Sequence, residues 1–143
     1  MSISYVAGLA FDAKGERVAL VLKNRPAFLA GFYNAIGGHI EDDEDMDVAM
    51  IREFMEETGC ETTEDDWEWF AAKDNDKFTL NFFVAHLSDE RFNTIRTMED
   101  EEIHILNVKD AIFNQQVQAD IAVLLLAVYT GLDVTFIQLY AKD

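Results

Sequence analysis

Proline and cysteine are almost missing from this chain. Its 143 residues contain one proline, Pro26, and one cysteine, Cys60. A single cysteine excludes a disulfide bond within the chain and fits a reducing compartment, so we expect a cytoplasmic protein. We interpret Cys60 as a small buried apolar residue rather than as a reactive thiol.

Long hydrophobic runs are missing as well. The longest apolar run, residues 121–129, is too short to cross a bilayer, and the first residues lack the basic and apolar segments of a signal peptide. We therefore expect no membrane partner. Half of the residues are hydrophobic, which excludes a disordered chain, and 143 residues suffice for a proper core. The expected organisation is one domain over residues 1–143.

Basic residues are few. Eleven Lys and Arg residues stand against 28 Asp and Glu residues, and the net charge is −17. Residues 41–68 hold 14 of the acidic residues and a single basic one, Arg52. Such a surface repels a long polyanion, because affinity for nucleic acid depends on Lys and Arg that neutralise phosphates. We expect no nucleic-acid partner, whereas a small phosphorylated molecule accompanied by divalent cations remains compatible with this charge.

An acidic helix is predicted over residues 45–58, which contain neither glycine nor proline and are followed by Gly59 as a stop. At about 100° per residue, Glu53, Glu56 and Glu57 fall within an arc of about 100°. Like charges at this spacing repel one another. A hard divalent cation with oxygen ligands, Mg²⁺ or Mn²⁺, would offset that repulsion.

The opposite side of the same helix carries apolar residues. We expect Val48, Ile51 and Met55, with Phe54 at the edge, to face the core. Arg52 is the only cation in the acidic segment, and a planar guanidinium can hold neighbouring carboxylates in fixed orientations. Two other interpretations stay open. One is a solvated acidic helix, and the other is an acidic Ca²⁺-binding or interaction protein, although the alternating Asp and Asn residues of an EF-hand loop are missing.

A specific pattern runs through residues 38–60, GHIEDDEDMDVAMIREFMEETGC. It resembles an unbroken Nudix box, G-x5-E-x7-R-E-U-x-E-E-x-G-U, in which U is a bulky apolar residue. Every fixed position matches, with Cys60 a small residue at the last one. The preceding YNAIGG resembles the segment that enters the box in this family, with Tyr33 where many members have Trp and Ile36 where many have Pro.

This resemblance implies an activity and a metal site. Nudix enzymes hydrolyse a nucleoside diphosphate linked to a further group, through attack of water on a phosphorus of the diphosphate. Arg52 would orient the glutamates, and Glu44 would support the loop and helix. The implied ligands of Mg²⁺ or Mn²⁺ are Glu53, Glu56, Glu57 and the carbonyl of Gly37 or Gly38.

The general base in this family is often a glutamate, either in the box or on a later loop. Residues 98–102, MEDEE, offer Glu99 and Glu101 as candidates for that role. A solvated charge is the alternative for each of them.

Substrate contacts are predicted just before the box. We single out Arg25 for a phosphate, and Phe32 and Tyr33 for stacking on a base. Asn34 could hydrogen-bond a base or cap a turn. A surface arginine and core aromatic residues are the alternatives for the other three.

The substrate itself is predicted from marks outside the box. ADP-ribose pyrophosphatases often carry a proline after the box, and dinucleoside polyphosphate hydrolases often carry a tyrosine nearby. Residues 74–78 of this chain, DNDKF, have neither. This favours a nucleoside triphosphate or a modified dNTP, in a pool-sanitising role. The alternatives are a pyrophosphatase for ADP-ribose, dinucleotides or nucleotide sugars and a non-catalytic nucleotide-sensing module. We expect a monomer or a homodimer.

The remaining segments predict an α/β protein. Strands are expected at residues 3–11 and 17–23, as a hairpin, and at 67–72, 77–87 and 101–108. Residues 24–31 should form a loop, and residues 88–100 a loop or short helix. A second helix is expected over residues 114–131, and residues 132–140 could add an edge strand or pair with another subunit. A mixed β-sheet with two flanking helices fits a three-layer α/β/α sandwich, which the resemblance also implies.

Overall fold

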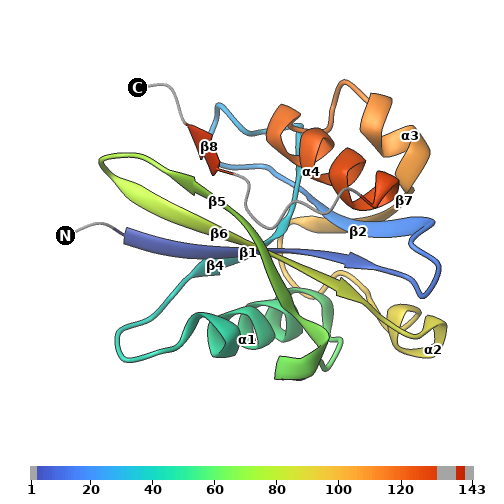
Figure 1. Cartoon of the computed structure of the whole chain (residues 1–143), viewed down its shortest axis with the longest axis horizontal. Helices are drawn as coiled ribbons and strands as arrows, with labels where there is room; N and C mark the ends of the chain where they lie inside the picture. Colours follow the sequence, from blue (N-terminus) through green and yellow to red (C-terminus); the bar gives the residue numbers. More distant parts are fainter. Residues whose placement is uncertain (1–2, 132–137, 141–143) are drawn as a thin grey trace.

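A computed structural model describes residues 3–131 and 138–140 (Figure 1). The strands are β1 (Ile3–Phe11), β2 (Arg17–Leu22), β3 (Tyr33–Asn34), β4 (Ile36–His39), β5 (Glu68–Asp74), β6 (Phe78–His86), β7 (Glu102–Asn107) and β8 (Gln138–Tyr140). The helices are α1 (Met46–Thr58), α2 (Asp89–Phe92), α3 (Val108–Phe113) and α4 (Ala119–Thr130), with a short 3-10 helix, η1 (Glu64–Asp66). No helix in these ranges is both long enough and apolar enough to cross a bilayer.

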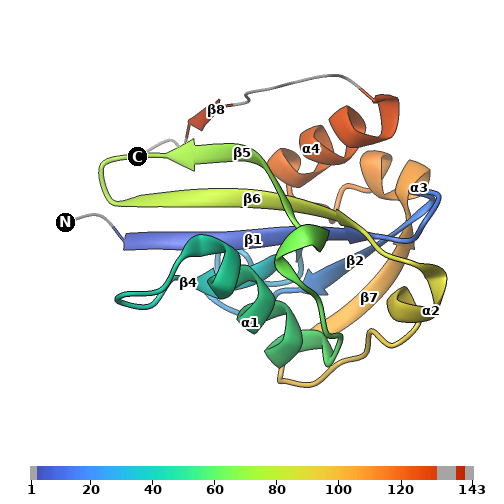
Figure 2. The same cartoon turned by 60° about the horizontal axis from the view of Figure 1, so that its bottom comes forward.

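The sheet is mixed, with β1 near its centre. On one side β1 pairs in parallel with β6, from Ile3 opposite Phe78 to Phe11 opposite His86. On the other side it pairs antiparallel, first with β4 and then with β2, and β7 adds to β2. Helix α1 covers one face, while α3 and α4 cover the other (Figures 1 and 2). The predicted three-layer α/β/α sandwich is therefore confirmed.

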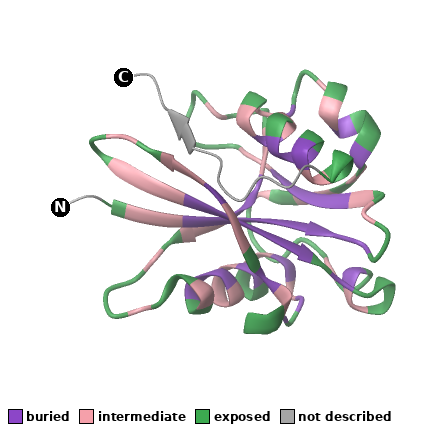
Figure 3. Cartoon of the chain, in the orientation of Figure 1, coloured by how far each residue is buried: buried purple, intermediate pink, exposed green. Residues whose placement is uncertain are grey.

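Each face of the sheet has its own apolar cluster, and buried residues fill the centre of the strands (Figure 3). Alternating residues of β1 supply both, because successive side chains of a strand point to opposite faces. Leu9 belongs to the cluster under α4, and Val6 to the cluster under α1. A Cβ at Gly8 would lie 2.7 Å from Met50 and 2.8 Å from Trp67, so this glycine lets α1 pack close to the sheet.

The predicted core face of α1 is confirmed for Ile51, which is partly buried against the cluster under α1, but was wrong for the other residues. Val48 and Met55 are 53% and 41% exposed, and Phe54 is fully buried rather than at the edge. The side chains of α1 that are buried are Ala49, Met50, Phe54 and Thr58. Met50, Phe54 and Thr58 follow one another at i,i+4 spacing, with Glu53 and Glu57 just beside them. The prediction placed the core opposite the carboxylates, whereas two of the carboxylates lie at the margin of the core.

Most other predicted elements are present. The hairpin of β1 and β2 is confirmed, and its turn is held by Asp12, whose Oδ1 accepts the N–H groups of Glu16 and Arg17 at 2.8 and 3.2 Å. The strands predicted at 67–72, 77–87 and 101–108 correspond to β5, β6 and β7, and the short helix within 88–100 is α2. Helix α4 begins at Ala119, five residues later than predicted from 114.

The sequence prediction missed β3, β4 and α3. The last is marked by its cap, because the Asn107 side chain accepts the N–H of Asp110 at the start of the helix. In the predicted segment 132–140, residues 132–137 lie outside the described residues. Residues 138–140 form β8, which pairs in parallel with the edge of β5.

Candidate active site

Two adjacent glycines bring β4 close to its neighbours. A Cβ at Gly37 would lie 1.8 Å from the carbonyl oxygen of Val6 in β1. A Cβ at Gly38 would lie 2.5 Å from Oε1 of Glu53. Real Cβ atoms do not approach so closely. Only glycine fits at position 37, where the neighbour is backbone, and a Cβ at position 38 would displace the Glu53 carboxylate. The Glu53 carboxylate of α1 thus lies directly against the backbone of Gly38.

Arg52 lies at the centre of the acidic residues of this segment. Its Nε and Nη2 donate to the two carboxylate oxygens of Glu44 at 2.8 and 2.9 Å, and Nη2 also donates to the carbonyl of His39 at 3.0 Å. Its Nη1 donates to Glu53 at 3.0 Å and to Glu56 at 3.4 Å. The bonds from Arg52 lower the pKa of Glu44 to about 2. This arginine therefore links the loop before α1 to two glutamates of the helix.

Glu57 differs from Glu44, whose two oxygens both accept bonds from Arg52. The Oε2 atom of Glu57 is buried without any hydrogen-bond partner. Burial, followed by the negative charges of Glu53 and Glu99, raises the pKa of Glu57 to about 8. Burial also raises the pKa of Glu53, although Arg52 opposes that effect. A buried carboxylate with an unpaired oxygen is costly, and a bound cation would remove this cost.

The later loop is attached to the end of α1. The N–H groups of Arg96 and Met98 donate to the carbonyls of Thr58 and Glu57, at 3.0 and 3.2 Å. These carbonyls belong to the last turn of the helix, where no later N–H group of the helix can bond them. The attachment brings Glu99 near enough for its charge to raise the pKa of both Glu53 and Glu57. Glu99 itself is exposed.

Glu101, the other candidate base, is already engaged on both oxygens. Its Oε1 accepts Nζ of Lys23 at 2.8 Å, and its Oε2 accepts the backbone N–H of Asn24 at 2.7 Å. Burial acts to raise the pKa of Glu101, but the bonds from Lys23 and the backbone outweigh it, so the pKa lies below its usual value. Glu101 therefore ties the start of β7 to the end of β2.

A cleft of about 560 Å³ adjoins Gly38. Its lining combines two cations, two polar side chains and a wall of mostly apolar residues. The lining residues are Lys23, Arg25, Asn34, His39, Gly37, Gly38, Tyr5, Val6, Ala7, Pro26, Leu29, Ala35 and Leu80. The site thus places positive charge and apolar surface next to the carboxylates of α1.

Of the predicted substrate residues, Arg25 and Asn34 line this cleft, and Phe32 and Tyr33 are not among its lining residues. Tyr33 is half-buried and packs against the cluster under α4, and Phe32 is 40% exposed. The amide of Asn34 donates to Oε1 of Gln118 at 2.8 Å.

Lys23 and Gln118 were missed by the sequence analysis. Lys23 stands at the end of an apolar strand pattern, and nothing local distinguishes it from a surface lysine. Gln118 was hidden inside the segment predicted as helix, yet it forms the N-cap position of α4. Both residues reach the site through contacts between distant segments.

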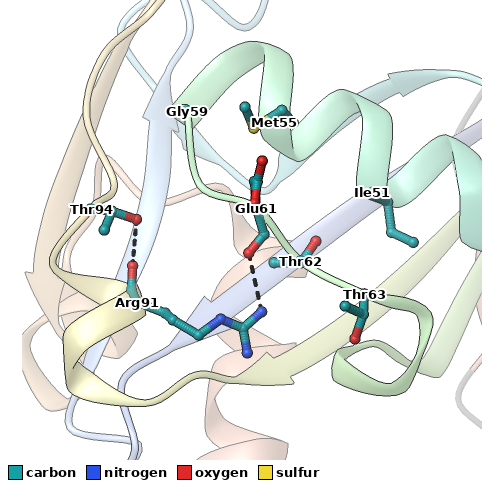
Figure 4. A pocket seen from close by; sticks show the side chains of 8 residues that line it. All are labelled: Ile51, Met55, Gly59, Glu61, Thr62, Thr63, Arg91 and Thr94. Atoms are coloured by element: carbon teal, nitrogen blue, oxygen red, sulfur yellow. Dashed lines mark hydrogen bonds between the residues drawn. The ribbon is translucent and has the colours of Figure 1, made fainter.

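A larger hollow of about 710 Å³ lies beside α1, against Ile51 and Met55 (Figure 4). It is lined by Ile51, Met55, Gly59, Glu61, Thr62, Thr63, Arg91 and Thr94. Arg91 is fully committed there, since its guanidinium bonds Asp66 and the carbonyl of Glu61. The smaller cleft, which contains Lys23 and Arg25 and adjoins Gly38, is therefore the candidate site.

The carboxylates of α1 have the right donor chemistry for a hard cation, although they are not yet gathered around one. Among residues 3–131 and 138–140, no three His, Cys, Asp or Glu side chains converge as a set of metal ligands. Glu53 and Glu56 point to Arg52 instead. The unpaired Oε2 of Glu57 and the Glu53 carboxylate against Gly38 fit Mg²⁺ or Mn²⁺, which prefer oxygen donors.

Solved structures of MutT proteins have the same fold. A structure from a study of MutT from Aliivibrio salmonicida and Vibrio cholerae matches with a TM-score of 0.68 and 22% identity, covering 87% of this chain and 96% of that chain. MutT proteins of Methanosarcina mazei and Bacillus halodurans match with TM-scores of 0.68 and 0.72 and identities of 18% and 17%. They cover 93% and 99% of this chain, and 96% and 91% of their own.

Sequence comparison gives the family. A search of curated protein sequences finds no match. The family model of the NUDIX domain matches residues 1–125, which include every box residue and the later loop. The chain therefore belongs to the Nudix family of pyrophosphohydrolases.

Proposed function

We propose that this chain, as a single Nudix domain over residues 1–143, hydrolyses a nucleoside triphosphate or a modified dNTP at its diphosphate bridge, with Mg²⁺ or Mn²⁺ bound. The observation that carries the proposal is the buried, unpaired Oε2 of Glu57 beside a cleft that contains Lys23 and Arg25. An anionic substrate and a cation together supply the partners that these groups need.

The carboxylates of α1 would hold the metal, with Glu57 and Glu53 innermost, Glu56 at the exposed end, and the Gly38 carbonyl as a further ligand. When bound, the cation supplies neutralisation of the bridging oxygens and lowers the pKa of water. Nη1 of Arg52 bonds Glu53 and Glu56 in the structure, and both carboxylates would turn from it to the cation.

Proton transfer is assigned to the later loop. Glu99 is exposed and lies near Glu57. Its carboxylate would take the proton of the attacking water as general base. Glu101, the other candidate from the sequence, is less suited to this role because both of its oxygens are engaged.

The cleft is suited to a nucleotide. Lys23 and Arg25 would bind phosphate oxygens, and the apolar wall with Leu80 and Tyr5 would receive the base. The Asn34 amide, fixed by Gln118, would hydrogen-bond a base edge. A pyrophosphatase for ADP-ribose, dinucleotides or nucleotide sugars is the runner-up, because the same cleft chemistry accepts these molecules.

The protein would act in a reducing cytoplasm, as a monomer or a homodimer. The support for the compartment is that the single thiol, Cys60, is buried, with contacts to the carbonyl oxygens of Glu61 and Arg91. Such a thiol is placed for packing and not for cross-linking.

The decisive experiment is a substrate panel with Mg²⁺, with Mn²⁺ and with a chelator. The panel contains dNTPs, oxidised dNTPs, ADP-ribose, NADH, FAD, dinucleoside polyphosphates and nucleotide sugars. We expect metal-dependent hydrolysis to be fastest for a nucleoside triphosphate, and to fall at least about 100-fold in Glu56→Gln. Glu64→Gln, which removes another exposed acid, from η1, is the matched control. Tight nucleotide binding without any hydrolysis would instead support a sensing module.

A further inference from the structure

We propose that Glu101 is a positioning residue that fixes the phosphate-binding segment Lys23–Asn24–Arg25, and that it is not the general base. The inference rests on the proposed function, because it assigns a task to that same cleft. Glu101 would thereby hold the positive charge of Lys23 in place on a chain whose net charge is −17.

The geometry joins two segments that are far apart in sequence. Lys23 directly follows β2, Glu101 directly precedes β7, and these two strands pair antiparallel up to Leu22 opposite Glu102. At that end Glu101 accepts Nζ of Lys23 and the N–H of Asn24. Its side chain is 9% exposed, so water does not compete freely for these two bonds. A charge-assisted bond in such a place is strong.

The two hydrogen bonds that Glu101 accepts hold the Lys23 ammonium and the backbone next to Arg25 in place. Lys23 and Arg25 both line the cleft, and Asn24 between them is held by its backbone. A free lysine side chain samples many rotamers, and fixing it beforehand lowers the entropy lost when a phosphate binds. Lys23 also lies near enough to Glu57 for its positive charge to oppose the rise in the pKa of that group. The anchored ammonium therefore lines the cleft and also acts on a carboxylate of the proposed metal site.

The same contacts argue against a role for Glu101 as a base. A general base needs an oxygen that can reach the attacking water, and both oxygens of Glu101 are taken. Glu99, two residues earlier, has an exposed carboxylate on the same loop.

Steady-state kinetics with the best nucleotide of the panel test this assignment. In Glu101→Gln we expect KM to rise about ten-fold or more, since a hydrogen bond to a charged group is lost, while kcat changes less than about three-fold. The pH profile of kcat should keep both limbs. In Lys23→Met the KM should rise similarly. The double variant should be no worse than Lys23→Met, because the amide oxygen of Gln can still accept the N–H of Asn24 and the bond lost in Glu101→Gln is the one to Lys23.

Asp100→Asn is the matched control, because it removes the same charge from the same loop without a contact to Lys23. Among the residues that the structure describes, the Asp100 side chain pairs only with Arg25, at 3.6 Å between two exposed side chains. The KM of Asp100→Asn should therefore stay the same or fall. The proposal would be overturned if turnover by Glu101→Gln fell at least about 100-fold, with loss of the acidic limb and unchanged KM, because Glu101 would then be the base. Multiplying effects in the double variant would overturn it too.

Two further measurements separate this proposal from the proposed function. Amide exchange of Asn24 should accelerate in Glu101→Ala and not in Asp100→Asn, whatever the substrate is. If the wild type hydrolyses nothing on the panel, calorimetry compares the affinities of Glu101→Gln and Asp100→Asn for dGTP in the presence of Mg²⁺. Weaker binding in Glu101→Gln than in Asp100→Asn supports the positioning role, and equal binding refutes it.

Discussion

Glu57→Gln is expected to make the metal-free protein more stable at alkaline pH, although it should abolish the activity. Burial, and then the charges of Glu53 and Glu99, raises the pKa of Glu57 from 4.5 to about 8. Gln has the same shape as the protonated carboxyl group and carries no charge. The variant therefore removes the cost of burying a carboxylate where no cation is bound.

The sign and size of the effect follow from the pKa difference. Because the folded-state pKa is the higher one, the folded protein binds more protons than the unfolded chain between about pH 4.5 and 8. The stabilisation from protonated Glu57 is complete below pH 4.5 and is lost as the pH rises through 8. At about 1.4 kcal/mol per pH unit the upper limit is about 5 kcal/mol. Solvent screening and the unpaired amide of Gln reduce the expected gain at pH 8.5 to about 1–3 kcal/mol.

Urea unfolding of wild type and Glu57→Gln, in chelator at pH 5.0 and 8.5, measures this gain. The two proteins should be nearly equally stable at pH 5.0, and the variant should be the more stable one at pH 8.5. Adding Mg²⁺ at 100 times its Kd should then stabilise the wild type by about 2.7 kcal/mol and the variant much less. Equal pH dependence of the two proteins, or equal stabilisation by Mg²⁺, would refute the reasoning. Glu64→Gln is the exposed control.

Three further substitutions test the packing around the site. Gly38→Ala places a Cβ where Glu53 Oε1 lies 2.5 Å away, so we expect turnover to fall by about ten-fold or more in a protein whose circular dichroism is unchanged. Gly37→Ala would place its Cβ 1.8 Å from the Val6 carbonyl. Since backbone cannot move aside as a side chain can, unfolding experiments should show a loss of about 3 kcal/mol or more, or no folded protein. Phe54→Ala empties a fully buried position and should cost about 3–5 kcal/mol in the same assay.

Helix α1 with its glutamates and the main strands could be predicted because their signals are local. Spacing alone places Glu53 and Glu57 one turn apart, and Gly59 ends α1 in the left-handed conformation as expected, with φ of 71°. The face that α1 buries was not predictable in the same way. Carboxylates were assumed to face water, whereas Glu57 is half-buried beside Phe54. A helical projection centred on Phe54, the largest apolar side chain of α1, would have found this.

The contacts of the cleft were beyond any local signal. Glu101 is 78 residues from Lys23 and 77 residues from Asn24 in the sequence, and it meets them only because β2 pairs with β7. In the sequence Lys23 and Glu101 each look like an ordinary surface charge. The partner of a strand is decided by the whole sheet, so such a pair is found only once the topology is known.

The bonds of Arg52 are compatible with the proposed cation site, although two of its glutamates are already bonded to this arginine. The Nε and Nη2 atoms of Arg52 are held by Glu44 and by the His39 carbonyl, and only Nη1 reaches Glu53 and Glu56. The two glutamates can therefore turn from Nη1 to a metal without releasing the guanidinium. Glu44, which matches the box but lies outside α1, is the anchor that makes this exchange local. The stability of the loop and the availability of the carboxylates thus depend on different nitrogens of one side chain.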